Sequence, residues 1–187
     1  MKDTVAKSPG FKLIRVDYMA ALMARGDLEE AKNQYHIAQA IPSVGYLEAL
    51  DINMAAICVR EGKYEEADKF YNQAIFKTKG NSVVVYEAYI SFLQELYAIR
   101  KGSVKTTDYR TLGKLIENLE KLYLLKKDPM LLYRLGQLSM SQADCKGALR
   151  YFEKARNAFP AQSEYALYSS KLFNQLASGS CRCWGSL

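Results

Sequence analysis

The residues of this 187-residue sequence that could do chemistry are few and scattered. The single histidine, His36, follows Tyr35 in a strongly patterned helical segment. A lone imidazole in such a place is more typical of a surface or packing residue than of a general base. The sequence also has no phosphate-cradling glycine loop, HExxH pair or GxSxG motif. We therefore expect no catalytic residue and no cofactor.

Cysteine is the other residue type that could form a site. Cys181 and Cys183 form a CxC pair in SGSCRCWGSL that could hold a soft metal ion. A tetrahedral site needs more ligands, and none lie nearby in the sequence, so we predict no metal site and a flexible tail. Cys58 and Cys145 are expected to be core or small surface residues. Four cysteines placed so unevenly favour a reducing compartment, and the cytoplasm is the expected location.

The composition is that of an ordinary globular chain, with 49 % hydrophobic and 25 % charged residues. No apolar run approaches the ~18 residues of a membrane span, and the N-terminal residues lack the pattern of a secretory signal. The net charge of +6 permits an acidic partner or a nucleic acid. Basic and acidic residues are interleaved, however, so we favour a solvated surface over a nucleic-acid footprint.

The elements that must position any site are predicted to be helices, and the helical segments recur as sequence repeats. GDLEEAKNQYHIAQAI begins at Gly26, and the similar GKYEEADKFYNQAIFK begins at Gly62. Ala31, Tyr35 and Ala38 recur 36 residues later, at the i, i+4, i+7 spacing of one helical stripe. Each glycine suits a turn, and another helical pattern precedes it. Each unit is therefore predicted to be helix, turn, helix.

A third copy lies downstream, in MLLYRLGQLSMSQADCKGALRYFEKARNAFP. Between the second and third copies, SVVVYEAYISFLQELYAIR, the loop KGSVKTTDY and RTLGKLIENLEKLYLLKKDP form a degenerate unit. After Pro160, SEYALYSSKLFNQLA predicts an amphipathic helix that covers the end of the stack. We expect a flexible segment 1–10, a repeat domain 11–160 with units 11–42, 46–79, 82–128 and 129–160, a capping helix 161–177 and a flexible tail 178–187.

The pattern resembles the tetratricopeptide repeat, a helical pair with a small residue in its first helix and alanine, aromatic, alanine and proline in its second. The residues that carry the resemblance best are Leu135, Gly136, Ala148, Phe152, Ala155 and Pro160. The first two copies depart from it, with Met19 and Ala55 in place of the first-helix glycine. The resemblance covers about residues 11–160 and implies an all-α, right-handed α-solenoid of about nine helices in stacked antiparallel pairs.

In that family the first helices of successive pairs line a concave groove that holds a peptide or helix of a partner. The resemblance places these positions in the groove: Val16, Ala20, Met23, Ile52, Asn53, Ala56, Val59, Tyr86, Ile90, Leu93, Tyr133, Arg134, Gln137 and Met140. The selected surface is mostly apolar, and its methionines adapt to irregular partners. The alternative is that these side chains pack on each other, or that the terminal helix fills the groove.

Some family members hold acidic chaperone tails with a clamp of Lys, Asn and Arg. Asn53 and Arg134 lie at clamp-like places, but Val16 and Ala20 stand where the clamp needs Lys and Asn. An apolar floor would leave a carboxylate poorly solvated, so no such clamp is expected.

The function predicted from the sequence is a non-catalytic scaffold or adaptor that binds another protein, with an assembly factor or chaperone as the nearest analogy. The alternative is a nucleic-acid-binding repeat protein that uses its positive charge and its tyrosines as stacking platforms. Self-association through weakly capped ends is also compatible with the sequence.

Overall fold

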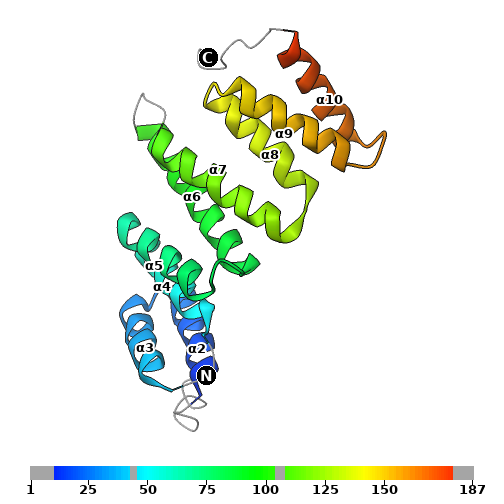
Figure 1. The fold of residues 1–187 in the computed structure, drawn as a ribbon. Coiled ribbons are helices and arrows are strands. Elements are labelled where there is room, and N and C mark those ends of the chain that lie inside the picture. The colour runs from blue at the N-terminus through cyan, green and yellow to red at the C-terminus, as the bar shows by residue number, and fades with distance from the viewer. Residues whose placement is uncertain (1–10, 43–45, 104–107, 179–187) are drawn as a thin grey trace. The chain divides into compact units, whose positions relative to one another are not determined.

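The computed structural model describes residues 11–42, 46–103 and 108–178, and within them all regular secondary structure is helical. This confirms the all-α class. The nine helices of the described residues are α2 (Lys12–Arg25), α3 (Leu28–Ala40), α4 (Glu48–Arg60), α5 (Tyr64–Lys77), α6 (Val83–Ser103), α7 (Tyr109–Lys126), α8 (Pro129–Ser141), α9 (Cys145–Ala158) and α10 (Glu164–Ala177) (Figure 1). The predicted flexible segment 1–10, the CxC pair and the tail beyond Ser178 lie outside the described residues.

The helices form two compact units, Met1–Tyr89 and Ile90–Leu187, and the boundary falls within α6. In the first unit α2 packs on α3 and α4 packs on α5, while α4 also contacts α2 and α3. In the second unit α8 packs on both α7 and α9, and α10 packs on α9 (Figure 1). In the first unit α2, α3, α4 and α5 therefore each lie beside the next helix in the chain, and in the second unit α7, α8, α9 and α10 do the same.

Three helix pairs, α2–α3, α4–α5 and α8–α9, contain the repeated alanine and aromatic residues, and we call them the signature pairs. The same turn joins the two helices of each. Gly26, Gly62 and Ala143 adopt left-handed backbone conformations, with φ of 84°, 73° and 58°. In each case the next residue donates its backbone N–H to a carbonyl five residues back: Asp27 to Leu22 (2.9 Å), Lys63 to Cys58 (2.8 Å) and Asp144 to Ser139 (2.9 Å). This is the hydrogen bond of a Schellman motif, which glycine favours because it has no Cβ. Ala143 thus takes the place of the glycine in the third copy.

The alanine and aromatic residues of the second helices are the best-buried stripe of each pair. All nine are at most 5 % exposed: Ala31, Tyr35, Ala38, Ala67, Tyr71, Ala74, Ala148, Phe152 and Ala155. Six of them are alanines, which let the neighbouring helix approach closely, and the aromatic ring fills the space between them. The stripe predicted from the sequence is therefore the packing surface of each pair.

Gly136 lies where the ring of Phe152 leaves no room for a side chain. A Cβ added to Gly136 would stand 2.7 Å from a ring carbon of Phe152, a contact that Cβ atoms do not make in practice. Phe152 is itself fully buried and cannot swing away. In the other pairs the corresponding Met19 and Ala55 are also fully buried, so the position is in the core in all three.

Side-chain caps define where the helices of the second unit begin. Asp108, Asp128, Asp144 and Ser163 each accept a hydrogen bond from a backbone N–H in the first turn of α7, α8, α9 and α10. Such caps satisfy one of the orphan donors of a helix N-terminus. No side-chain cap bond is found at α2 to α5 of the first unit. In the first unit, packing against neighbouring helices must therefore define where the helices begin, more than in the second unit.

The boundaries of the degenerate pair differ from the prediction. The loop was predicted over residues 101–109, but α6 continues to Ser103 and α7 begins at Tyr109. Gly102 does not stop α6, because one glycine costs a helix interior only about 1 kcal/mol. With 21 and 18 residues, α6 and α7 are longer than the helices of the signature pairs.

We predict that Gly136→Ala lowers the free energy of unfolding by about 1–3 kcal/mol, because the added methyl group overpacks the contact with Phe152. Gly113→Ala is the matched control, since Gly113 is exposed on α7 and an added Cβ meets nothing within 4 Å. That change should raise stability by about 0.5–1 kcal/mol through helix propensity. Urea unfolding followed by circular dichroism measures both; equal effects would contradict the packing argument.

Candidate partner-binding groove

The predicted groove residues fall into two classes in the structure. Nine of them are half-buried or exposed: Ala20, Ile52, Asn53, Ala56, Val59, Tyr133, Arg134, Gln137 and Met140. These keep surface that a partner can reach within their own unit. Their role in binding stays a prediction.

The remaining predicted positions lie in the core. Val16, Met23, Tyr86 and Ile90 are 5 %, 8 %, 5 % and 3 % exposed, and Leu93 is fully buried. Val16 and Met23 belong to the core cluster of the first unit, together with Leu22 and Leu50. For α2 the reason is geometric: this helix packs against its partner α3 and also against α4, so only a narrow face is left for a groove. These side chains offer almost no surface to a partner.

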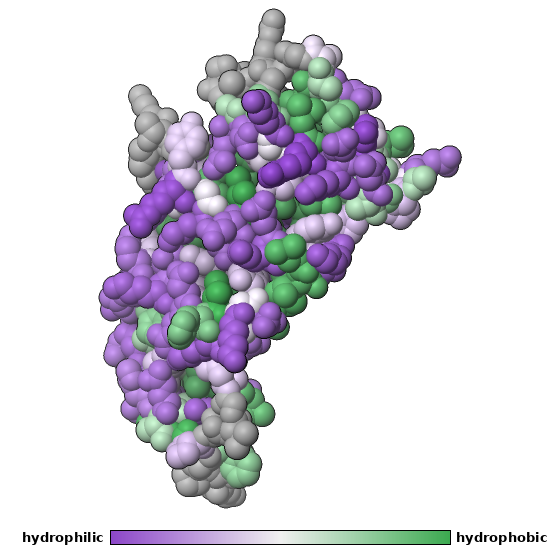
Figure 2. Space-filling view, viewed as in Figure 1, coloured by the Kyte–Doolittle hydropathy of each residue, from purple (hydrophilic) through white to green (hydrophobic). Residues whose placement is uncertain are grey.

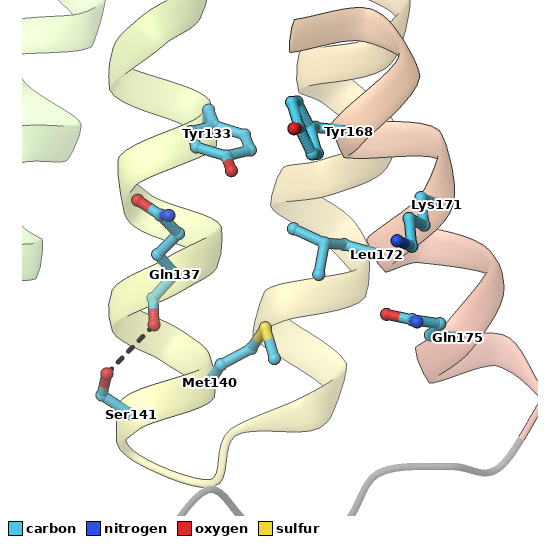
Figure 3. A pocket seen from close by; sticks show the side chains of 8 residues that line it. All are labelled: Tyr133, Gln137, Met140, Ser141, Tyr168, Lys171, Leu172 and Gln175. Atoms are coloured by element: carbon cyan, nitrogen blue, oxygen red, sulfur yellow. Dashed lines mark hydrogen bonds between the residues drawn. The ribbon is translucent and has the colours of Figure 1, made fainter. Parts of the chain in front are cut away.

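A pocket of about 440 Å³ lies between α8 and α10. The residues lining it are Tyr133, Gln137, Met140 and Ser141 from α8 with Tyr168, Lys171, Leu172 and Gln175 from α10 (Figure 3). Tyr133 and Met140 reach from α8 toward the Leu172 side of α10 in this view. Both helices pack on α9, which holds them apart and leaves the space between them open. The structure thus brings together three of the predicted residues on α8.

Aromatic contacts fix one end of this pocket. The ring of Tyr133 meets Phe152 edge to face with 5.8 Å between centroids, and it meets Tyr165 in the same manner at 5.6 Å. Tyr165 in turn stacks on Phe159 at 5.4 Å. Such pairs restrict ring motion and contribute beyond area burial alone. Burial raises the pKa of the Tyr133 hydroxyl, and the nearby tyrosines of α10 add to the effect, so the phenol stays neutral.

The α10 residues of the pocket were not among the predicted site residues, because this helix was expected to cover the end of the stack or, as the alternative, to fill the groove. α10 does pack on α9, through a buried face that includes Ala166, Ser169 and Leu176. Beside this face, Tyr168, Lys171, Leu172 and Gln175 line the pocket, and Leu172 also packs against the buried cluster. The sequence does contain a pattern that could have predicted them, because these four residues follow the i, i+3, i+4, i+7 spacing of one helical stripe. α10 therefore behaves like the first helix of a further pair.

The polar groups that line the pocket are hydrogen-bond donors and acceptors. Its lining has two phenols, two amides, a hydroxyl and one ammonium group, with no carboxylate, imidazole or thiol. His36 lies elsewhere, exposed on α3, with its ring edge-on to Tyr35 at 5.4 Å. In the part of the chain that the structure describes, no three His, Cys, Asp or Glu residues gather to hold a metal ion. Cys58 is free and buried, as predicted for a core residue.

The first unit has a smaller hollow of about 340 Å³ beside the carboxylate of Asp51. Asp51 is 1 % exposed and accepts hydrogen bonds from the hydroxyls of Tyr35 (2.9 Å) and Tyr46 (2.6 Å) and from the ammonium of Lys77 (3.0 Å). Lys77 also lies over the Tyr46 ring, 5.0 Å from its centroid. Burial, together with the neighbouring carboxylate, raises the pKa of both tyrosines well above the ordinary value, so both keep their protons as donors.

This cluster links three helices of the first unit. Asp51 is on α4, Tyr35 is on α3 and Lys77 ends α5, so one buried charge joins three helices. A buried carboxylate is costly unless it is paired and hydrogen-bonded, and here donors reach both of its oxygens. Because its groups satisfy one another, we do not assign this hollow to a ligand.

The comparisons with known proteins identify the fold. No family model matches the sequence, and no curated protein is significantly similar to it. Among solved structures, the chain resembles YrrB, described as a TPR protein with an unusual peptide-binding site, at a TM-score of 0.60 and 13 % identity, over 99 % of this chain and 86 % of that one. It also resembles PilF of Pseudomonas aeruginosa, at a TM-score of 0.54 and 18 % identity, over 91 % and 71 % of the two chains.

A third similar structure is the Cut9-Hcn1 hetero-tetramer of the APC/C, at a TM-score of 0.50 and 11 % identity, over 89 % of this chain and 30 % of that one. The first of these neighbours, YrrB, is the one described as a tetratricopeptide-repeat protein. The chain therefore has the tetratricopeptide-repeat fold, as the resemblance in its sequence indicated. Within the described residues, no helix has the length and apolar character that crossing a membrane requires.

We predict that Lys77→Met lowers the free energy of unfolding by about 1–2 kcal/mol, because the buried Asp51 carboxylate loses its cationic partner. The magnitude is held down by the partial exposure of Lys77. Lys69→Met, at an exposed position of the same helix, should change stability by no more than about 0.5 kcal/mol. Urea denaturation measures the free energy of unfolding of both variants. Equal losses of stability would show that Lys77 does not compensate the buried charge.

Proposed function

We propose that this protein is a non-catalytic adaptor that binds a peptide or helix segment of another protein in the pocket between α8 and α10. The observation that carries the proposal is the pocket itself, which lies on the face where Tyr133, Gln137 and Met140 were expected to meet a partner. A second helix, α10, completes it, so a bound segment would be held from two sides (Figure 3).

The lining of the pocket fits a protein partner. Its volume of about 440 Å³ suits one or two bulky side chains. Met140 and Leu172 supply adaptable apolar surface, while Tyr133 and Tyr168 offer rings with a polar tip. Aromatic residues and methionine are enriched at protein interfaces. Gln137 and Gln175 add amide groups, which pair with the backbone of an extended segment.

The neighbouring structures support this proposal by analogy. One is described as having a peptide-binding site, and another is part of a hetero-tetramer. By the same analogy, we extend the proposal to an assembly or chaperone role for a partner subunit. Cytoplasmic location and self-association remain predictions of the same kind.

The nucleic-acid alternative finds less support in the side-chain contacts. Several tyrosines that would serve as stacking platforms use their hydroxyls on carboxylates instead, including Tyr35 on Asp51, Tyr89 on Asp68 and Tyr151 on Glu120. Basic side chains are likewise paired with acidic ones, including Lys32 with Glu29 and Glu61, and Arg100 with Asp108. On the face drawn in Figure 2, hydrophilic residues predominate and hydrophobic ones form small groups between them. This arrangement is typical of a solvated surface.

We predict that a benzophenone amino acid placed at Tyr168 crosslinks to a discrete partner protein in the producing cells, whereas the same group at Leu167 does not. The two positions are adjacent on α10 and similarly exposed, at 48 % and 62 %, but only Tyr168 lines the pocket. The crosslinked product is detected by its mass shift on a denaturing gel and identified by mass spectrometry. Equal products from the two positions, or none from Tyr168, would overturn the proposal.

A second variant tests the apolar floor in the same assay. Met140→Asp should reduce the Tyr168 crosslink about tenfold or more, because it places a charge where the partner buries apolar surface. Leu124→Asp, on an exposed site of α7 outside the pocket, should leave the crosslink unchanged. Circular dichroism of both variants shows whether the helices are retained.

A further inference from the structure

The charge distribution of the α8–α10 pocket carries information about the segment that it binds, beyond its apolar floor. Lys171 is the one charged residue among those lining the pocket. It is exposed on α10, and among the described residues it makes no ion pair or hydrogen bond with a side chain. Other basic residues of the described chain do pair with acids, as Arg156 does with Glu153 within α9 and Lys32 does with Glu61 in the turn after α4. Lys171 is not used in this way.

The position of Lys171 next to Leu172 and Gln175 gives its ammonium group a particular role. A lysine at the rim of an apolar surface lays its aliphatic stem along that surface and keeps its charge at the edge. A carboxylate that arrives with an apolar side chain would meet this charge where water is partly displaced. Pairs in such surroundings are less screened by salt than pairs on an open surface.

Building on the function proposed above, we infer that the pocket selects a partner segment in which a large apolar side chain is followed or preceded, within about one helical turn, by a carboxylate. The apolar side chain occupies the space between Tyr133, Met140 and Leu172. The carboxylate pairs with Lys171. Lys171 is then the residue that sets the charge preference of the site, while the apolar residues supply most of the affinity.

This charge preference separates a partner protein from two other occupants. The chain's own residues 179–187, GSCRCWGSL, include Trp184 but also Arg182 and no acidic residue. Arg182 would bring a like charge toward Lys171, which disfavours this segment as the occupant. A second copy of the chain would have to present its own acidic residues beside an apolar one, and sedimentation at several concentrations detects such association.

The test uses a library of random heptapeptides displayed on phage and selected against the purified full chain. Enriched sequences should combine a large apolar residue with a nearby Asp or Glu. For peptides synthesised from the selection, replacing the acid by its amide should weaken binding about fivefold in fluorescence anisotropy, as expected for a partly exposed ion pair. The loss should shrink as salt is raised.

Two charge reversals of the protein complete the test. Lys171→Glu should weaken binding of the acidic peptides about tenfold and shift a repeated selection toward Lys and Arg. Lys154→Glu changes the net charge equally at an exposed site of α9 outside the pocket, and it should leave affinity and selection unchanged. Both substitutions are at exposed positions, so the fold is retained and circular dichroism verifies this.

Each outcome bears on a different claim. Enrichment of apolar peptides with no acidic preference would overturn the role of Lys171 and leave the proposed function standing. A selection that enriches no sequence, or enriched peptides that bind Met140→Asp as well as the parent, would overturn both. Enrichment by a chain truncated after Ser178, but not by the full chain, would show that residues 179–187 fill the pocket, and would overturn the inference that a partner occupies it.

Discussion

Close packing of alanines and an aromatic ring against the preceding helix is the interaction on which the rest of this structure depends. A single helical pair leaves one apolar face exposed to water and is not stable alone. Burying that face against a neighbouring pair contributes a free energy of about 25 cal/mol per Å² of apolar surface. The alanines at both ends of the stripe let the helix axes come close, so that the ring between them is enclosed on all sides. Tyr35, Tyr71 and Phe152 are at most 5 % exposed. The surfaces left over after this packing are those available for function.

Each of the three signature pairs packs a buried aromatic ring against its first helix, but the residues that do so differ. Where the first helix offers Gly136, the ring is that of Phe152, which takes the space a Cβ would need. In the first unit the rings belong to tyrosines, and their polar ends are satisfied or shielded by neighbours. Tyr35 donates to the buried Asp51, and the Tyr71 ring stacks on Tyr89 at 5.2 Å. The core of the first unit therefore contains a polar network that also joins its helices.

The pocket is a consequence of this packing and of one additional helix. Because α8 and α10 both pack on α9, the faces of α8 and α10 that turn toward each other cannot close the space between them. Their side chains include rings, a thioether and an aliphatic group, with amides around them. The result is an open pocket of mixed polar and apolar character.

The sequence by itself determined the helical class, the pairing of helices and the buried stripe. These follow from local spacing: residues at i, i+4 and i+7 share one face of a helix in any context, and Gly26 and Gly62 permit a left-handed turn. The loop between α6 and α7 was placed less well, because one glycine such as Gly102 is too weak a signal to end a helix.

Only the tertiary structure decided which first-helix positions remain at the surface. Val16 and Ala20 stand one helical turn apart on α2, yet Val16 is in the core and Ala20 is exposed. Their difference depends on which neighbouring helices cover each side, and sequence spacing does not contain that information. The same holds for α10. The spacing of its residues predicts a stripe, but the sequence does not show that Lys171 and Leu172 share a pocket with Met140 of α8. That arrangement depends on both helices packing on α9. Spacing along a chain fixes which side chains share a face, whereas packing between helices fixes what that face meets.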